Sequence, residues 1–459
     1  MKSFFQKYKP YYADSLKLAI PVVISQAGHM VVQMSDGVVV GHFAGTVSLA
    51  AVSLANSVFY IPMMIGVGIS YGITPLIAQS NGRNDQAECG RLLANGLFIN
   101  IITSVILGCA IYFGATALLA HLGQSPAVVV QAQPFLRFLA LSVVPMLVFT
   151  TFKQFAEGLG FTKQAMLISI WGNVINICLG IVFVKGLFGI PSMGVRGVGL
   201  STLIDRTVMA VVMAVYVFRS KNFKDYIKTF ALSVVNKTRG LEIFKIGAPV
   251  ALQYTFELGA FSSAAILIGT MGPIPQASHL VAMTMAALTY MMASGISAAA
   301  AIRSGNYFGS NDHDKLKLSA MSNYHIVIAF MTFSALVFTF GSHLLPCIFT
   351  SDERVITIAS QLLIIAAAFQ LFDGTQVVGL GVLRGMGDVN IPTIITLIAY
   401  WVVGLPSAWL LGIHYNLGVK GIWYGLVLGL LTASGLLFIR FTVISRKYRL
   451  KTPVIVAAD

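Results

Sequence analysis

Residues Gln361–Asp388 read QLLIIAAAFQLFDGTQVVGLGVLRGMGD, an apolar segment with a single carboxylate, Asp373, near its middle. About 20 apolar residues are enough to cross a bilayer as a helix. A charge at the centre of such a helix costs at least ~2.5 kcal/mol, so a chain keeps it for pairing or for function. The segment therefore predicts a membrane-spanning helix that carries a functional acid.

The rest of the chain has the same apolar character. Its 459 residues are 57% hydrophobic and only 10% charged, whereas soluble domains carry about 25% charged residues, and the mean hydropathy is +0.82. The apolar segments are longer than the strands of a membrane β-barrel, which have about 10 residues. We therefore expect an all-α polytopic membrane protein with about twelve helices. They are predicted near 14–41, 47–79, 92–120, 127–151, 162–186, 195–218, 241–269, 277–305, 316–345, 353–381, 391–413 and 419–445.

Positive charges gather in the tails and in short loops on one side of the expected helices. The net charge of +14 could indicate a nucleic-acid partner, but its placement next to apolar segments argues against one. The connection at 219–240 is the longest and most basic. Because Lys and Arg favour the cytoplasmic side, both termini are expected in the cytoplasm.

An internal repeat divides the chain at this basic connection. Three short motifs recur with an offset of 227 residues: Gly68-Ile69-Ser70 and Gly295-Ile296-Ser297, Asn84-Asp85 and Asn311-Asp312, and Glu157-Gly158-Leu159-Gly160 and Arg384-Gly385-Met386-Gly387. The repeat predicts an N-lobe at 1–218, a cytoplasmic linker at 219–240 and a C-lobe at 241–459. Six helices in each half make the repeats parallel, as in transporters that rock two lobes about a central site.

Four carboxylates fall inside the expected helices: Asp36, Asp205, Glu257 and Asp373. A buried carboxylate can be neutralised by a proton or by a small cation held with neighbouring oxygens, and either event can bias two conformations. Asp205 directly precedes Arg206, so the expected role of this acid is a structural ion pair. The other three are expected to be functional.

Several neutral or polarisable side chains could accompany these acids. The candidate cavity or substrate contacts are Gln33, Asn173, Gln253, Met283, Met291 and Gln376. The methionines surround Tyr290 and would suit a pocket of broad specificity. For the methionines, ordinary helix packing is the favoured explanation, and for Asn173 interhelical hydrogen bonding is equally open.

Motifs of enzymes and ATP-driven pumps are absent. The sequence has no Walker A loop, no HExxH zinc motif and no Gly-x-Ser-x-Gly elbow. No cofactor is expected, and energy would come from a gradient of Na+ or H+. A membrane-embedded enzyme is disfavoured because His29 and His279 have no second ligand at helical spacing.

Taken together, several short segments resemble the multidrug and toxic compound extrusion (MATE) transporters, in particular their NorM-type branch. The similar segments are Pro21 with Asp36-Gly37 and Gly41, Glu157-Gly158-Leu159-Gly160, Asn176 with Val195-x-Gly197, Phe256-Glu257, Phe372-Asp373-Gly374 and Leu383-Arg384-Gly385. The resemblance extends over roughly residues 14–445.

This resemblance implies two six-helix bundles that form a V around a cavity, in a monomer of a bacterial inner membrane. It implies export of organic cations and amphipathic drugs by antiport with Na+ or H+. The C-lobe cation residues of the family correspond to Glu257, Tyr290 and Asp373, and the N-lobe ones to Asp36, Asn176 and Thr202. Gly180 stands where relatives often carry a second Asn or Asp, which leaves a proton switch at Asp36 open as an alternative to Na+ binding.

A lipid-linked-oligosaccharide flippase of the wider superfamily is the alternative function. Such a flippase should line its cavity with several Arg or Lys for a pyrophosphate headgroup. The charges expected within the helices here are mostly acidic, which favours a cationic substrate.

Overall fold

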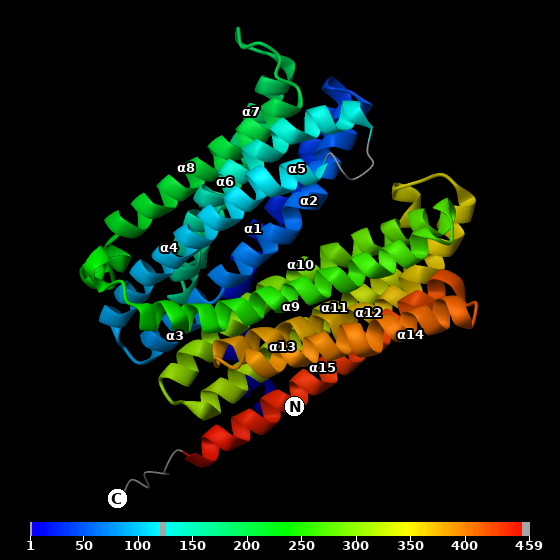
Figure 1. The fold of residues 1–459 in the computed structure, drawn as a ribbon. Coiled ribbons are helices and arrows are strands. Elements are labelled where there is room, and N and C mark those ends of the chain that lie inside the picture. The colour runs from blue at the N-terminus through cyan, green and yellow to red at the C-terminus, as the bar shows by residue number, and fades with distance from the viewer. Residues whose placement is uncertain (1, 120–124, 452–459) are drawn as a thin grey trace, which may run out of the picture. The chain divides into compact units, whose positions relative to one another are not determined.

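The computed structural model describes residues 2–119 and 125–451 (Figure 1). Within these ranges the secondary structure is helical and contains no strand. Twelve helical segments of the described chain are long and apolar enough to cross a membrane. The prediction of an all-α polytopic membrane protein is therefore confirmed.

The chain forms two compact units. The N-unit comprises residues 24–251, and the C-unit comprises residues 1–23 together with 252–459. Helices α1 (Lys2–Phe43) and α9 (Lys237–Gly269) contribute to both units. The unit boundaries therefore fall inside the first helix of each repeat, and not in the basic linker where the lobes were expected to divide.

Besides its parts of α1 and α9, each unit contains the following elements. The N-unit contains α2 (Thr46–Ser70), α3 (Ile73–Gly82), α4 (Gln86–Cys109), η1 (Ala110–Ala115), α5 (Thr116–Leu118), α6 (Pro126–Gly158), α7 (Thr162–Lys185) and α8 (Val195–Arg219). The C-unit contains α10 (Pro273–Gly309), α11 (His313–Phe340), η6 (Pro346–Ile348), α12 (Glu353–Gly385), α13 (Asn390–Leu397), η7 (Ile398–Gly404), α14 (Leu405–Trp409), η8 (Leu410–His414) and α15 (Gly418–Lys451).

The repeat is visible in the local geometry of the backbone. Asn84 and Asn311 both adopt positive φ, at 58° and 55°. The residues that follow them, Asp85 and Asp312, each cap a helix by accepting a backbone hydrogen bond three residues ahead, at 2.9 and 3.0 Å. Such side-chain caps satisfy backbone donors that a helix start leaves free. The same short motif therefore starts the equivalent helices α4 and α11.

Three of the expected helices are interrupted in the described chain. The segment expected at 92–120 contains the π-helical stretch η1 between α4 and α5. The segment expected at 47–79 is divided into α2 and α3 at Tyr71–Gly72, where a Cβ on Gly72 would lie 2.5 Å from the carbonyl oxygen of Ile243. The segment expected at 391–413 contains two π-helical stretches, η7 and η8. Pro406 lies at the start of α14, just after η7, and has no N–H to donate to the preceding turn.

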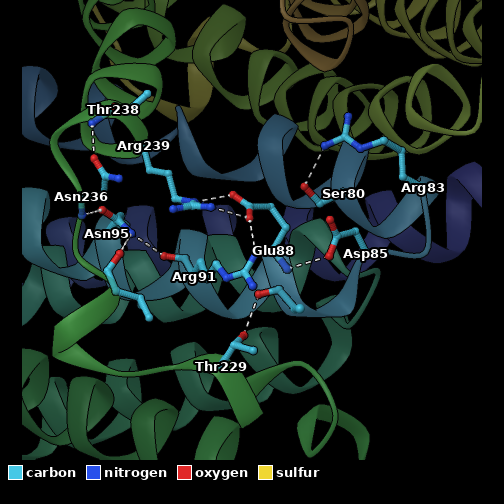
Figure 2. A network of polar contacts seen from close by, with 12 residues as sticks. Ser80, Arg83, Asp85, Glu88, Arg91, Asn95, Thr229, Asn236, Thr238 and Arg239 are labelled. Carbon is cyan, nitrogen blue, oxygen red and sulfur yellow. Dashed lines mark hydrogen bonds and ion pairs between the residues drawn. The ribbon is translucent and has the colours of Figure 1, made fainter.

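The basic linker is docked on the N-unit by a polar network (Figure 2). The linker contains three short 3-10 turns, η3 (Lys221–Phe223), η4 (Ile227–Thr229) and η5 (Leu232–Val234). Arg239 forms two hydrogen bonds with the carboxylate of Glu88, at 2.6 and 3.0 Å, and Arg91 approaches the same group at 3.1 Å. The backbone N–H of Asn236 donates to Asn95 at 2.8 Å. The start of α4 therefore holds the linker through side chains as well as backbone.

Candidate functional site

The C-unit brings together the three C-lobe residues predicted from sequence. Glu257 on α9 and Asp373 on α12 are only 7% and 3% exposed. The two carboxyls lie within electrostatic reach of each other, and Tyr290 on α10 is within reach of both. Three helices therefore converge on one buried acidic cluster, which we call the C-site.

Small residues hold the helices of the C-site at short range. A Cβ on Gly381 or Gly385 would collide with α10 at Ser297 or at Ala301. The hydroxyl of Ser297 donates to the carbonyl oxygen of Val377 at 2.7 Å, one turn after Asp373. Close approach of this kind is how membrane helices gain packing energy without a hydrophobic driving force. It places Tyr290 and Asp373 on facing helices.

Sequence reasoning missed Tyr400, which also belongs to the C-site. Its ring is 1% exposed, and it is within electrostatic reach of Glu257 and Asp373. The neighbouring Trp401 donates from Nε1 to the carbonyl oxygen of Phe256 at 3.1 Å, which fixes η7 against α9. No spacing in the sequence relates Tyr400 to the acids, so only the packing of η7 could reveal it.

Polar atoms along α12 have unmet hydrogen-bonding capacity. Asp373 Oδ1, Gln376 Nε2 and both amide atoms of Gln370 are buried without a partner. Since nearly all buried polar groups are hydrogen-bonded, the site is suited to bind an ion, a proton or water. The glutamines lie three residues before and after Asp373, so helical spacing could have predicted that Gln370 accompanies the predicted Gln376.

The other predicted C-lobe residues have different surroundings. The amide nitrogen of Gln253 donates to Thr393 at 3.0 Å and to the carbonyl oxygen of Val389 at 3.3 Å, which ties α9 to α13. Met283 packs against the apolar core of the unit, and Met291 is half-buried. Arg384 lies over the ring of Tyr254, 5.9 Å from its centre, and is within electrostatic reach of Glu257.

The N-unit gathers a second polar cluster, which we call the N-site. Asn176 on α7 donates to the hydroxyl of Thr202 on α8 at 3.3 Å. Asn176 also interacts with Asp205, and Asp205 and Arg206 are within electrostatic reach of Asp36 on α1. The predicted N-lobe residues are therefore connected through Asp205 and Arg206.

The remaining predictions for the N-lobe have mixed outcomes. Asn173 is buried, and its amide nitrogen lies where a Cβ of Gly28 on α1 would stand. Gln33 is exposed on the surface of the unit. A structural ion pair of Asp205 with Arg206 or another basic residue was expected. Asp205 has no ion pair within 4.0 Å in the described chain, and Arg206 donates to Ser142 at 2.7 Å.

A cavity of about 500 Å³ lies elsewhere in the C-unit. Its walls come from the end of α9, the start of α12, and η8 with the start of α15, and Lys420 is the charged residue of its lining. It contains none of the C-site acids. The size of this cavity therefore does not mark the functional site of the C-unit. The buried carboxylates of the C-site mark it.

The two clusters share the chemistry of buried acids with oxygen-bearing neighbours. Within the described residues, no group of three or more His, Cys, Asp or Glu side chains could hold a metal ion. Two carboxylates in each unit can be neutralised by protons, by a monovalent cation held with neutral oxygens, or by a positively charged organic molecule.

Comparison with known proteins gives a consistent result. The family model described as MatE matches residues 21–182 and 249–410. The chain is 31% identical to "Probable multidrug resistance protein NorM" of Xanthomonas axonopodis pv. citri, over 94% of this chain and 93% of that protein. It is 30% identical to the protein of the same name in Agrobacterium fabrum, over 95% of both chains.

The fold also matches solved structures. The bent form of the Vibrio cholerae MATE transporter VcmN aligns with a TM-score of 0.87 at 18% identity, over 97% of this chain and 99% of that chain. The two matches to the family model begin 228 residues apart, at 21 and 249, so each repeat contains one copy.

Proposed function

This chain belongs to the MatE family, and from that premise we propose that it is a cation-coupled antiporter that exports organic cations and amphipathic drugs. It is a transporter and not an enzyme, and no resident cofactor takes part. The observation that carries the proposal is the C-site, where Glu257, Tyr290 and Asp373 meet with buried acceptor atoms that lack a donor.

In the proposed mechanism, the coupling ion and the substrate compete for the same negative charge. A proton or Na+ neutralises Glu257 and Asp373 in one conformation, and an organic cation replaces it in the other. A ligand can shift a conformational equilibrium only by binding one state more tightly. Buried carboxylates meet this condition because their charged form is costly without a cation nearby.

The N-site is proposed as a second place of coupling. Asp36 is the acid that changes its charge there, with Asn176 and Thr202 as neutral oxygen ligands. A Cβ on Gly180 would lie in ordinary contact with Ser201 Oγ, at 3.6 Å, and the glycine supplies no side-chain oxygen. The site therefore offers fewer ligands to a metal cation.

The family and the charge distribution support a place in the membrane. The protein is proposed to act as a monomer in a bacterial inner membrane, with both termini in the cytoplasm and lipid on the apolar outer faces of its helices. The basic residues of the linker support this orientation by the positive-inside rule.

A lipid-linked-oligosaccharide flippase is the alternative, and the C-site speaks against it. A pyrophosphate headgroup requires several cationic side chains, whereas among the described residues Arg384 is the one cation within electrostatic reach of Glu257. Two buried carboxylates would repel such a headgroup.

Transport into proteoliposomes tests the proposal. A fluorescent organic cation is offered under an imposed Na+ gradient alone, and separately under a pH gradient alone. We expect uptake under at least one gradient, and its loss in Asp373→Asn and Glu257→Gln while both variants still elute as folded protein. Equal uptake by wild type and both variants would remove these acids from the mechanism. Absence of uptake by folded wild type under either gradient would favour the flippase.

A further inference from the structure

The cavity of about 500 Å³ in the C-unit lies among the ends of its helices. Its walls come from the end of α9, the start of α10, the first turns of α12, and η8 with the start of α15. Because membrane-spanning helices begin and end at the bilayer surfaces, these walls stand at the level of the lipid headgroups. Trp409 and Tyr415 beside η8 are exposed, and membranes favour such aromatic residues at this level. Since α9 begins at Lys237 next to the basic linker, its other end, and the cavity with it, faces away from the linker.

The lining is mostly apolar and carries one positive charge. Its apolar side chains are Met271, Pro275, Ile358, Ile413, Leu417 and Val419. Lys420 is the charged residue among the lining residues, which include no Asp or Glu. It is exposed and forms no ion pair within 4.0 Å in the described chain. Asp352, at the start of α12, is already paired with Arg354 at 3.0 Å. The cavity therefore offers an uncompensated cation beside an apolar wall.

Further hydrogen-bond donors line the same cavity. Gln361 on α12 and Asn416 before α15 have exposed side-chain amides, and each amide can donate two hydrogen bonds. Gly418 and Lys420 belong to the first turn of α15, and the start of a helix favours negative charge. A Cβ on Gly418 would meet nothing within 4 Å, so the space in front of this backbone is open. These groups suit a phosphate.

We propose that this cavity binds one anionic phospholipid, with its phosphate at Lys420 and its glycerol and upper acyl chain along the apolar wall. The inference goes beyond the proposed export function, because it concerns a separate site of the C-unit. A volume of about 500 Å³ lies within the usual range of ligand pockets. A free phosphate ion would leave the apolar wall uncovered, whereas a lipid covers the wall and meets the charge. In the proposed orientation, the lipid comes from the leaflet that faces away from the cytoplasm.

The internal repeat supplies a matched control for Lys420. Gly194-Val195-Arg196-Gly197 starts α8 as Gly418-Val419-Lys420-Gly421 starts α15, and the first glycine of each motif has positive φ, at 53° and 60°. In the proposed topology both helices start on the same side of the membrane. Arg196 is exposed and lies in the N-unit, outside the lining of the cavity. It is therefore an equivalent cation without this pocket.

The test uses purified full-length protein in detergent and native mass spectrometry, which counts bound lipids. The probes are phosphatidylglycerol, phosphatidylethanolamine with the same acyl chains, and glycerol 1-phosphate as a headgroup without chains. We expect the wild type to bind one phosphatidylglycerol more tightly than phosphatidylethanolamine, and glycerol 1-phosphate not to displace it. Lys420→Ala should weaken this binding at least about tenfold, because hydrogen bonds to charged groups are strong. Gln361→Trp keeps the charge but fills the cavity, and should weaken binding as well.

Arg196→Ala removes the same charge and should bind phosphatidylglycerol as the wild type does. Equal binding by the wild type and Lys420→Ala would overturn the inference. An equal loss in Arg196→Ala would overturn it too, since the attraction would then be non-specific. Displacement by glycerol 1-phosphate would show a site for free anions, and equal binding of phosphatidylethanolamine would show that Lys420 does not select an anionic lipid.

Folding of each variant is checked by its midpoint of thermal unfolding. Lys420→Gln replaces Lys420→Ala if the alanine variant unfolds at a lower temperature. Because lipid counting requires no transport, its outcome is independent of whether the proposed export function is correct.

Discussion

Gly295 on α10 lies directly against Val23 on α1, and Gly68 on α2 lies in the same way against Ala251 on α9. A Cβ on Gly295 would stand 3.0 Å from the carbonyl oxygen of Ala19 and would collide with Val23. The first contact lies within the C-unit and the second within the N-unit, and the two are equivalent in the internal repeat. These close contacts explain why the start of α1 belongs to the C-unit and the start of α9 to the N-unit.

Replacing either glycine by alanine should destabilise the protein. Gly68→Ala and Gly295→Ala insert a methyl group where backbone atoms already touch, which typically costs about 1–3 kcal/mol. We expect a lower midpoint of thermal unfolding in detergent for both. Gly114→Ala and Gly435→Ala are matched controls, because a Cβ at those glycines meets nothing within 4 Å. A drop of the same size in the controls would contradict the packing explanation.

Tyr400→Phe should weaken both the stability of the C-unit and transport. The hydroxyl of Tyr400 donates to the side-chain oxygen of Gln376 at 2.9 Å, and the variant leaves that buried oxygen without a donor. Interhelical hydrogen bonds in membranes are worth about 1 kcal/mol, so the unfolding midpoint should fall modestly. Transport should fall further than stability, since Gln376 lies one turn from Asp373. Tyr424→Phe, at a residue 45% exposed on α15, should change neither measurement.

Gly172 and Gly180 on α7 should respond differently to alanine. At Gly172 the added methyl group meets the side chain of Met209 and the carboxylate of Asp205, whereas at Gly180 the nearest atom is 3.6 Å away. We expect Gly172→Ala to reduce substrate binding and transport, and Gly180→Ala to remain close to wild type. Titration with a fluorescent organic cation measures the first effect. If both variants bind alike, Asp205 has no part in the N-site.

Glu88→Gln should loosen the linker. Glu88 is the acceptor for both Arg239 and Arg91, so the neutral amide removes two charge-assisted contacts at once (Figure 2). Charge-assisted hydrogen bonds are stronger than neutral ones, and we expect faster hydrogen exchange and proteolysis within 219–240. Asp225→Asn is the control, because its pair with Lys228 is largely exposed. Unchanged exchange in Glu88→Gln would show that backbone contacts alone hold the linker.

Much of the architecture could be predicted from the sequence because the relevant signals are one-dimensional. The cost of placing polar groups in lipid makes the apolar spans recognisable, and short motifs such as Asn84-Asp85 and Asn311-Asp312 reveal the repeat without any contact information. The acids Glu257 and Asp373 were identifiable because a carboxylate is rare at bilayer depth. Glu257, Tyr290 and Asp373 lie within electrostatic reach of one another in the C-unit, and their role in cation coupling stays a prediction.

The direction in which each helix faces could not be predicted from the sequence and comes from the tertiary structure. A membrane helix is apolar on all sides, so its sequence carries little information about which face packs inward. Helix orientation places Tyr400 in the C-site and brings Arg206 within electrostatic reach of Asp36 and Asp205. It also divides α1 and α9 between the two units. The spans, the repeat and the buried acids can be read from the amino-acid sequence, whereas the neighbours of each acid depend on how the helices pack.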